Sequence, residues 1–217
     1  MTHLARTQPS PSTLLTINFL TLTFLAFIFL FIWQGANVFA YVISLFRSTT
    51  PSTDMMIGIA AGGVVSLGLY ITAKLGWTKM PNNEITDVLK PNSKRLVVSS
   101  IGIGLGSGLS EEILFRGFLL AWIVSFSSAW IGLIVSSLVF GALHVMQYRG
   151  HPWIQAYILT FGFVMGGLFV WTGNLWAPFL MHATYNSLVF IMLGSGAIPY
   201  AERRGSKLEE EGEDEEA

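Results

Sequence analysis

The sequence predicts an all-α fold, a polytopic membrane helix bundle of about six spans with a buried polar site. Three observations support this prediction. Only 12% of the 217 residues are charged, whereas a soluble domain has about 25%. Several apolar runs are long enough to cross a bilayer, which takes roughly 20 residues. The few ionisable side chains inside these runs lie in three of them, which indicates a shared polar site.

The first apolar run has no charged residue from Leu14 to Phe46. At about 1.5 Å per residue this run is too long for one upright span and short for two spans with a turn. We expect one span near 14–34, followed by a shorter interfacial or tilted piece through Phe46. A cleaved signal peptide is the less favoured interpretation, because its apolar region is usually shorter.

Five further spans are expected after the loop that follows this run. They cover residues 55–73, 96–127, 129–146, 153–171 and 175–193. The polar segment 74–95 carries five basic residues and should lie in the cytoplasm, since basic loops favour that side. With six spans, both the N- and the C-terminus would also be cytoplasmic in this integral membrane protein.

Changes in composition divide the chain into four parts. They are an N-terminal polar segment (1–13), N-terminal membrane helices with the basic loop (14–95), a membrane core that holds the ionisable side chains (96–194) and an acidic tail (195–217) that is expected to be disordered. Eight of the thirteen acidic residues lie in this tail. No clustered basic face is evident, which argues against a nucleic-acid partner. The absence of cysteine excludes disulfides, a thiolate nucleophile and cysteine metal ligands.

A glycine run precedes the charged residues of the third long span. It reads "GIGLGSG". It is not a dinucleotide-binding loop, because such a loop needs a strand–turn–helix unit in a soluble domain. In a membrane helix, the glycines are predicted to form two small-xxx-small pairs, 102/106 and 104/108. Such pairs let another helix approach closely.

Three charged side chains follow the glycine run, although charge in the bilayer core costs at least ~2.5–3.5 kcal/mol on insertion scales. Glu112 and Arg116 are four residues apart, so they share a helix face in the favourable order for an ion pair. Glu111 is rotated by about 100° from that face. It therefore has no local partner, and a carboxylate in this position can serve as a general base.

Histidines lie in two later spans. Phe140 and His144 are four residues apart and share a face, as do His182 and Asn186. An imidazole and a carboxamide that point together can donate two hydrogen bonds to an oxyanion. A carboxylate with a histidine could activate a water, so peptide-bond hydrolysis would need no serine or cysteine nucleophile.

Upright spans of this kind place His144 and His182 near opposite membrane faces. We therefore expect the third long span to be kinked or re-entrant around the glutamates, or one span boundary to be shifted. The glycine run favours a kink.

Each of these polar groups also has a structural interpretation. A single histidine or Asn186 could form an interhelical hydrogen bond, and Glu112–Arg116 could be a packing clamp. Two histidines and a carboxylate could also hold zinc with an open site, although the zinc-protease signature H-E-x-x-H is absent. The conjunction of all these groups favours catalysis over any one of these interpretations.

Three motifs in order carry a family resemblance. They are Glu111-Glu112-x-x-x-Arg116, Phe140-x-x-x-His144 and His182-x-x-x-Asn186. Together they resemble the CAAX-protease and bacteriocin-processing enzyme family, known as the CPBP or ABI family. The resemblance implies an all-helical intramembrane endopeptidase of the glutamate type, with no metal or other cofactor.

The resemblance also implies roles for these residues. Glu111 with His144 would activate the water, and His182 with Asn186 would form the oxyanion hole. The supporting residues would be Glu112, Arg116 and Phe140. The expected partners are the lipid bilayer and a membrane protein or peptide as the substrate. The alternative is a non-proteolytic membrane scaffold or assembly factor, which would bind a partner in a membrane complex.

Overall fold

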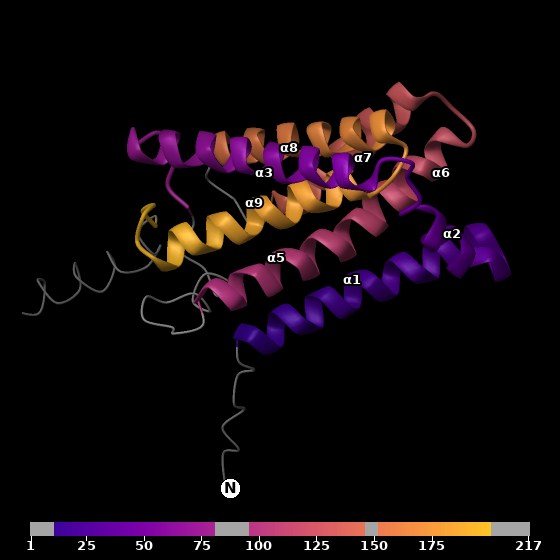
Figure 1. Ribbon diagram of the computed structural model, residues 1–217, viewed down its shortest axis with the longest axis horizontal. Coiled ribbons are helices and arrows are strands. Elements are labelled where there is room, and N and C mark those ends of the chain that lie inside the picture. The colour runs from indigo at the N-terminus through magenta and orange to yellow at the C-terminus, as the bar shows by residue number, and fades with distance from the viewer. Residues whose placement is uncertain (1–10, 81–95, 146–151, 201–217) are drawn as a thin grey trace, which may run out of the picture.

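A computed structural model describes residues 11–80, 96–145 and 152–200 (Figure 1). Within these ranges the regular elements are helical, apart from one isolated β-bridge between Met80 and Tyr200. This confirms the all-α fold. Residues 1–10, the basic loop from residue 81 onward and the acidic tail from residue 201 onward lie outside the described residues, so their predicted character stays a prediction.

The first apolar run forms a long helix and a short one. Helix α1 spans Pro11–Gln34, and α2 spans Val38–Ser44 after the single 3₁₀ turn η1 (Gly35–Asn37). Gly35 has a φ of +59°, a conformation that a residue without a Cβ adopts at little cost. The chain therefore changes direction at this glycine, as expected for one span followed by a shorter piece.

Helix α9 (Trp176–Gly194) lies between α3 (Pro51–Lys74) and α5 (Leu96–Glu112) (Figure 1). Glycines allow this close packing on both sides. A Cβ at Gly62 of α3 would lie 2.6 Å from the carbonyl oxygen of Met181, too close for any larger residue. Since α9 carries His182 and Asn186, these contacts set the depth of both side chains.

The predicted pairing of the glycines in α5 is half correct. Gly104 and Gly108 both face α9, where a Cβ would lie 2.5 Å from Ala183 O and 3.1 Å from Ala183 N. The 102/106 pair is wrong, because a Cβ at Gly102 would have no neighbouring atom within 4 Å, whereas a Cβ at Gly106 would meet the ring of Phe19 on α1. Different glycines of the run therefore pack against two neighbouring helices, Gly104 and Gly108 against α9 and Gly106 against α1.

The third long span changes its helical form directly after the glutamates. Helix α5 continues as a π-helix, η2 (Ile113–Leu120), and then as α6 (Ala121–Val124). In η2, the N–H of Ala121 donates to the carbonyl of Arg116, five residues earlier. Tyr41 Oη of α2 also donates to Gly117 O at 2.7 Å. The expected irregularity thus lies at the glutamates, but it is a π-helix and not a kink at the glycines.

Helices α7 (Ala129–His144) and α8 (Pro152–Thr172) complete the bundle. Within the described chain, four stretches are long and apolar enough to cross a membrane, and α7 is a shorter apolar helix. These stretches are Thr13–Ser44, Pro51–Lys74, Pro152–Thr172 and Trp176–Gly194. Large apolar side chains such as Ile32 and Trp130 face outward at 75% and 74% exposure, which suits contact with lipid. The chain is an integral membrane protein.

A polar cluster joins two loops at the end of the bundle where α2 and α6 lie. The buried carboxylate of Asp54 accepts hydrogen bonds from Ser48 Oγ at 2.5 Å and from Asn174 Nδ2 at 2.8 Å. In the backbone, the Leu175 N–H donates to Leu45 O at 2.7 Å. The start of α9 is therefore anchored to the segment between α2 and α3.

Candidate active site

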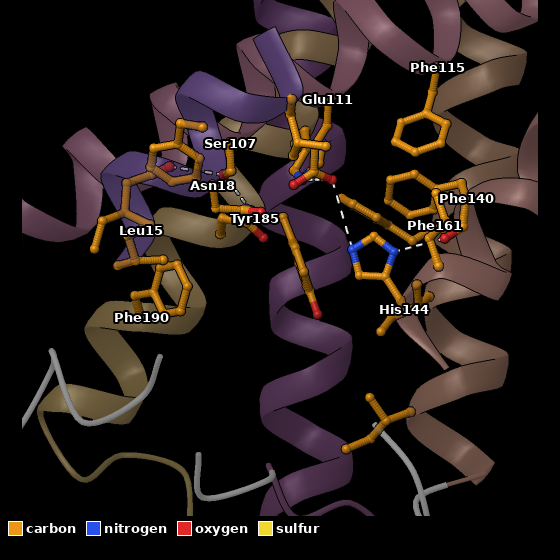
Figure 2. Close-up of a pocket in the computed structure, with 18 of the residues that line it drawn as sticks. Leu15, Asn18, Ser107, Glu111, Phe115, Phe140, His144, Phe161, Tyr185 and Phe190 are labelled. Carbon is orange, nitrogen blue, oxygen red and sulfur yellow. Dashed lines mark hydrogen bonds and ion pairs between the residues drawn. The ribbon is translucent and has the colours of Figure 1, made fainter. Parts of the chain in front are cut away.

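Glu111 lies where three of the predicted segments meet. Its Oε2 atom is 3.8 Å from Nε2 of His144 and 3.9 Å from Nε2 of His182. This oxygen is buried and accepts no hydrogen bond within the described part of the chain. Figure 2 shows the carboxylate of Glu111 and the imidazole of His144 pointing toward each other across the pocket.

The two separations around Glu111 have a chemical consequence. Both exceed the length of a direct hydrogen bond, which is about 2.7–3.2 Å. Polar groups at such distances are often joined by a water that bonds to both of them. The geometry is therefore suited to a water held between the carboxylate of Glu111 and an imidazole.

His144 is oriented by its own helix. Its Nδ1 lies 2.8 Å from the carbonyl oxygen of Phe140, one turn earlier in α7. A carbonyl only accepts, so Nδ1 carries the hydrogen, and the Nε2 of a neutral imidazole is then left as an acceptor. This nitrogen is the one that faces Glu111. The ring of Phe140 also lies 4.6 Å from that of His144, centroid to centroid.

His182 is oriented by Glu112. Its Nδ1 lies 2.9 Å from Glu112 Oε1, and the same oxygen accepts a hydrogen bond from Arg116 Nη1 at 2.9 Å. Arg116 Nη2 donates in turn to Gly162 O of α8 at 2.8 Å. The predicted Glu112–Arg116 ion pair is therefore present and fully buried. Its bond to His182 was not predicted from the sequence.

Phe140 packs against this charged cluster. The guanidinium carbon of Arg116 lies 4.8 Å from the Phe140 ring centroid, a cation–π distance. Phe115 packs edge-on against the same ring at 5.0 Å, and His182 lies 6.2 Å from it. One aromatic ring thus contacts residues of all three motifs.

Asn186 is held by a residue that was not predicted from the sequence. Its Nδ2 donates to Ser107 Oγ at 2.8 Å, and Ser107 Oγ donates to Ile103 O at 2.9 Å. Ser107 lies four residues before Glu111 and so shares its helix face. The spacing of Ser107 and Glu111 can be seen in the sequence. The contact of Ser107 with Asn186, 79 residues away, cannot be predicted from it.

The four predicted catalytic residues line one cavity of about 310 Å³ inside the bundle (Figure 2). Most of the other lining side chains are apolar or aromatic, including Phe115, Phe140, Phe161 and Phe190. Asn18 of α1 also lines the cavity and was not predicted. Its carboxamide lies within an apolar run that has no charged residue, and this isolated polar group could have marked Asn18 as a candidate site residue.

The expected difference in depth between His144 and His182 is absent, since both lie near Glu111. Helix α7 has 16 residues and is shorter than α8, which has 21, so its last residue does not mark a membrane face. The assumption that this apolar run is a full upright span was therefore wrong for α7.

Within the described chain, no group of three or more histidine, aspartate and glutamate side chains has a geometry that could hold a metal ion. The expectation of metal-free chemistry stays a prediction. It needs a direct test with chelators.

Comparisons with known proteins agree with the motifs. Residues 93–188 match the family described as type II CAAX prenyl endopeptidase Rce1-like. A relative in Bacillus subtilis (strain 168), the uncharacterized protein YpbD, is 34% identical over 90 residues, which are 42% of this chain and 43% of that protein. The alignment thus spans less than half of either protein. No solved structure matches the chain significantly. The matched family region contains all three motifs and confirms the resemblance.

Proposed function

We propose that this chain, which belongs through residues 93–188 to the Rce1-like CAAX endopeptidase family, is an intramembrane endopeptidase. It would hydrolyse a peptide bond of a membrane-associated protein or peptide. The observation that carries this proposal is the convergence of Glu111 Oε2 with two imidazole nitrogens, at 3.8 and 3.9 Å, inside a cavity of the bundle.

In the proposed reaction, Glu111 removes a proton from a water while His144 Nε2 accepts a hydrogen bond from the same water. The resulting hydroxide attacks the scissile carbonyl carbon and forms a tetrahedral oxyanion. The proton held by Glu111 then passes to the leaving nitrogen, and the C–N bond breaks. The products are a carboxylic acid and an amine, so the water is fully accounted for.

His182 and Asn186 would stabilise the oxyanion. His182 Nδ1 is engaged with Glu112, so donation to an oxyanion must come from Nε2, which requires a protonated ring.

Asn186 would supply the second hydrogen bond to the oxyanion. One Nδ2 hydrogen is bonded to Ser107 Oγ, and a carboxamide has a second hydrogen on the same nitrogen. Asn186 lines the cavity with His182, one helical turn away. Removal of one such donor lowers kcat by about 10²–10³-fold in a well-studied protease.

The test uses the purified full chain in lipid vesicles with a library of single-span membrane peptides that have polar tails. New peptide termini are identified by mass spectrometry. The variants Glu111→Gln and His144→Ala are expected to lower the cleavage rate by about 10²–10⁴-fold, the usual contribution of a general acid–base group. Asn37→Leu, at an exposed site outside the cavity, serves as the control.

The outcomes separate the alternatives. Unchanged cleavage in both variants would overturn the proposal. Cleavage that is lost with a chelator and restored by zinc would favour the metal-dependent version. A scaffold role instead predicts no cleavage, a stable stoichiometric complex, and rescue of a deletion phenotype by Glu111→Gln at normal protein level.

A further inference from the structure

We infer that Asn18 is a substrate-binding residue, whose carboxamide holds the extended backbone of the substrate beside the scissile bond. This inference rests on the proposed function and adds a recognition element to it. Asn18 belongs to α1, which lies outside the family region of residues 93–188. The binding site for the substrate would thus be completed by a helix that the family match does not include.

The position of Asn18 supports this role. Asn18 lines the same cavity as Glu111, His144 and His182. Its neighbour Phe19 packs against Gly106, where a Cβ would lie 3.0 Å from the ring. This contact places α1 at the level of α5 that is about one turn before Glu111. In Figure 2, Asn18 lies on the Ser107 side of the cavity and His144 on the other side.

The chemistry of the Asn18 side chain also supports this role. The carboxamide has two donor hydrogens and an acceptor oxygen, and within the described ranges it forms no hydrogen bond with the protein. The side chain is exposed, so a ligand in the cavity can reach it. A polar group in an apolar membrane helix is costly without partners. Its place at the cavity therefore points to a polar ligand there.

An unwound substrate needs such a partner. A peptide bond inside a membrane helix has its N–H and C=O groups paired within the helix, so the substrate must unwind locally before its carbonyl can be attacked. In a bilayer the freed groups need new partners. A carboxamide can donate to the carbonyl and accept from the N–H of one extended residue. Because Asn18 would bind backbone atoms of the substrate, it would favour an extended membrane segment and show little preference for the side chains of that segment.

The kinetic test uses a membrane peptide that the wild-type chain cleaves. Asn18→Leu is nearly isosteric and is expected to raise KM by about 5- to 30-fold, the loss of one or two hydrogen bonds, with little change in kcat. Asn18→Gln should recover part of this loss. Asn37→Leu, an exposed asparagine that does not line the cavity, should behave as wild type. A wild-type KM for a folded Asn18→Leu variant would overturn the inference.

A crosslinking test separates this inference from the proposed function. The photoreactive residue p-benzoylphenylalanine is placed at position 18 or at position 17 in the Glu111→Gln chain, and the vesicles receive the same peptide library. Ile17 is exposed and does not line the cavity, so peptide crosslinks are expected at position 18 only.

Crosslinks confined to position 18 would support peptide binding there even if the wild-type chain cleaves nothing. In that case the proposed function fails and the binding role stands. Equal crosslinking at both positions, or none at position 18, would overturn the binding role even where cleavage is observed.

Discussion

Glu112 shows how one buried oxygen can organise a site. Its Oε1 accepts from both Arg116 Nη1 and His182 Nδ1 at 2.9 Å. The two donors come from different helices, so this atom sets their relative position. Hydrogen bonds that involve charged groups are stronger than neutral ones. Within the described residues, Oε2 of the adjacent Glu111 accepts no hydrogen bond. This difference supports the proposal that Glu112 is the supporting carboxylate and Glu111 the reactive one.

Ser107 is expected to act through Asn186. Ser107→Ala removes the acceptor that orients the Asn186 carboxamide, so kcat should fall by about 10-fold, a fraction of the effect of a lost oxyanion donor. KM should change little. Ser107→Thr keeps the hydroxyl and should retain most of the activity. The measurement is the kcat and KM of peptide cleavage.

Ser110→Ala is the matched control for this prediction. Ser110 is also a buried serine of α5, and its Oγ bonds only to backbone carbonyls of its own helix. An equal loss of kcat in Ser107→Ala and Ser110→Ala would indicate a general effect on α5 and contradict a role through Asn186.

At the scale of elements, the glycines of α5 connect helix packing to the geometry of the candidate site. Gly104→Ala places a methyl group 2.5 Å from Ala183 O, so α9 must move away from α5. Overpacking of this kind costs about 1–3 kcal/mol. His182 and Asn186 move with α9, and we expect a lower Tm together with a loss of activity. Both are measured on the purified protein.

Gly102→Ala is the control in the same helix. A Cβ at this position meets no atom within 4 Å, and alanine favours a helix over glycine by about 1 kcal/mol. Its Tm should equal or exceed that of the wild type, with full activity. A lower Tm for Gly102→Ala than for Gly104→Ala would contradict this packing of α5 against α9.

The π-helix η2 is the second element that shapes the candidate site. It begins at Ile113, directly after the two glutamates. A π-helix adds one residue to the turn and so rotates the later part of the helix relative to the earlier part. Arg116 lies inside η2 and still reaches Glu112. Gly117 is a weak helix former within η2, but nothing else in the local sequence indicates this change of form.

At the scale of the whole molecule, the fold gives the two ends of the bundle different charges. Among the described residues, Lys74 and Lys79 lie at the end where α3 finishes and α5 begins, whereas Arg47 lies at the other end. Basic residues favour the cytoplasmic side. The end that carries the two lysines is therefore predicted to be cytoplasmic, together with both termini.

The orientation can be tested by labelling single cysteines, because the native chain has none. Leu75→Cys and Thr49→Cys replace exposed residues at opposite ends. A membrane-impermeant maleimide should label Thr49→Cys in intact cells and Leu75→Cys only after permeabilisation. The cysteine-free chain measures the background, and the reverse pattern would place the termini outside.

Much of the fold could be predicted from the sequence because the signals are local. Apolar runs located every helix that the structure describes, and the four-residue spacing of Glu112 and Arg116 predicted an ion pair that the structure contains. The sequence also separated Glu111 from that pair. The predicted catalytic roles of Glu111, His144, His182 and Asn186 stay predictions until cleavage is measured.

The sequence by itself determined the membrane character, the helices and the identity of the polar residues, because hydropathy and helical periodicity act over neighbouring residues. Only the tertiary structure decided which residues meet. The approach of His144 and His182 to Glu111, the bond from Asn186 to Ser107 and the place of Asn18 depend on the rotation and depth of whole helices. Those are set by glycine contacts, by aromatic packing and by one π-helix, and such long-range packing has no local signature in the chain.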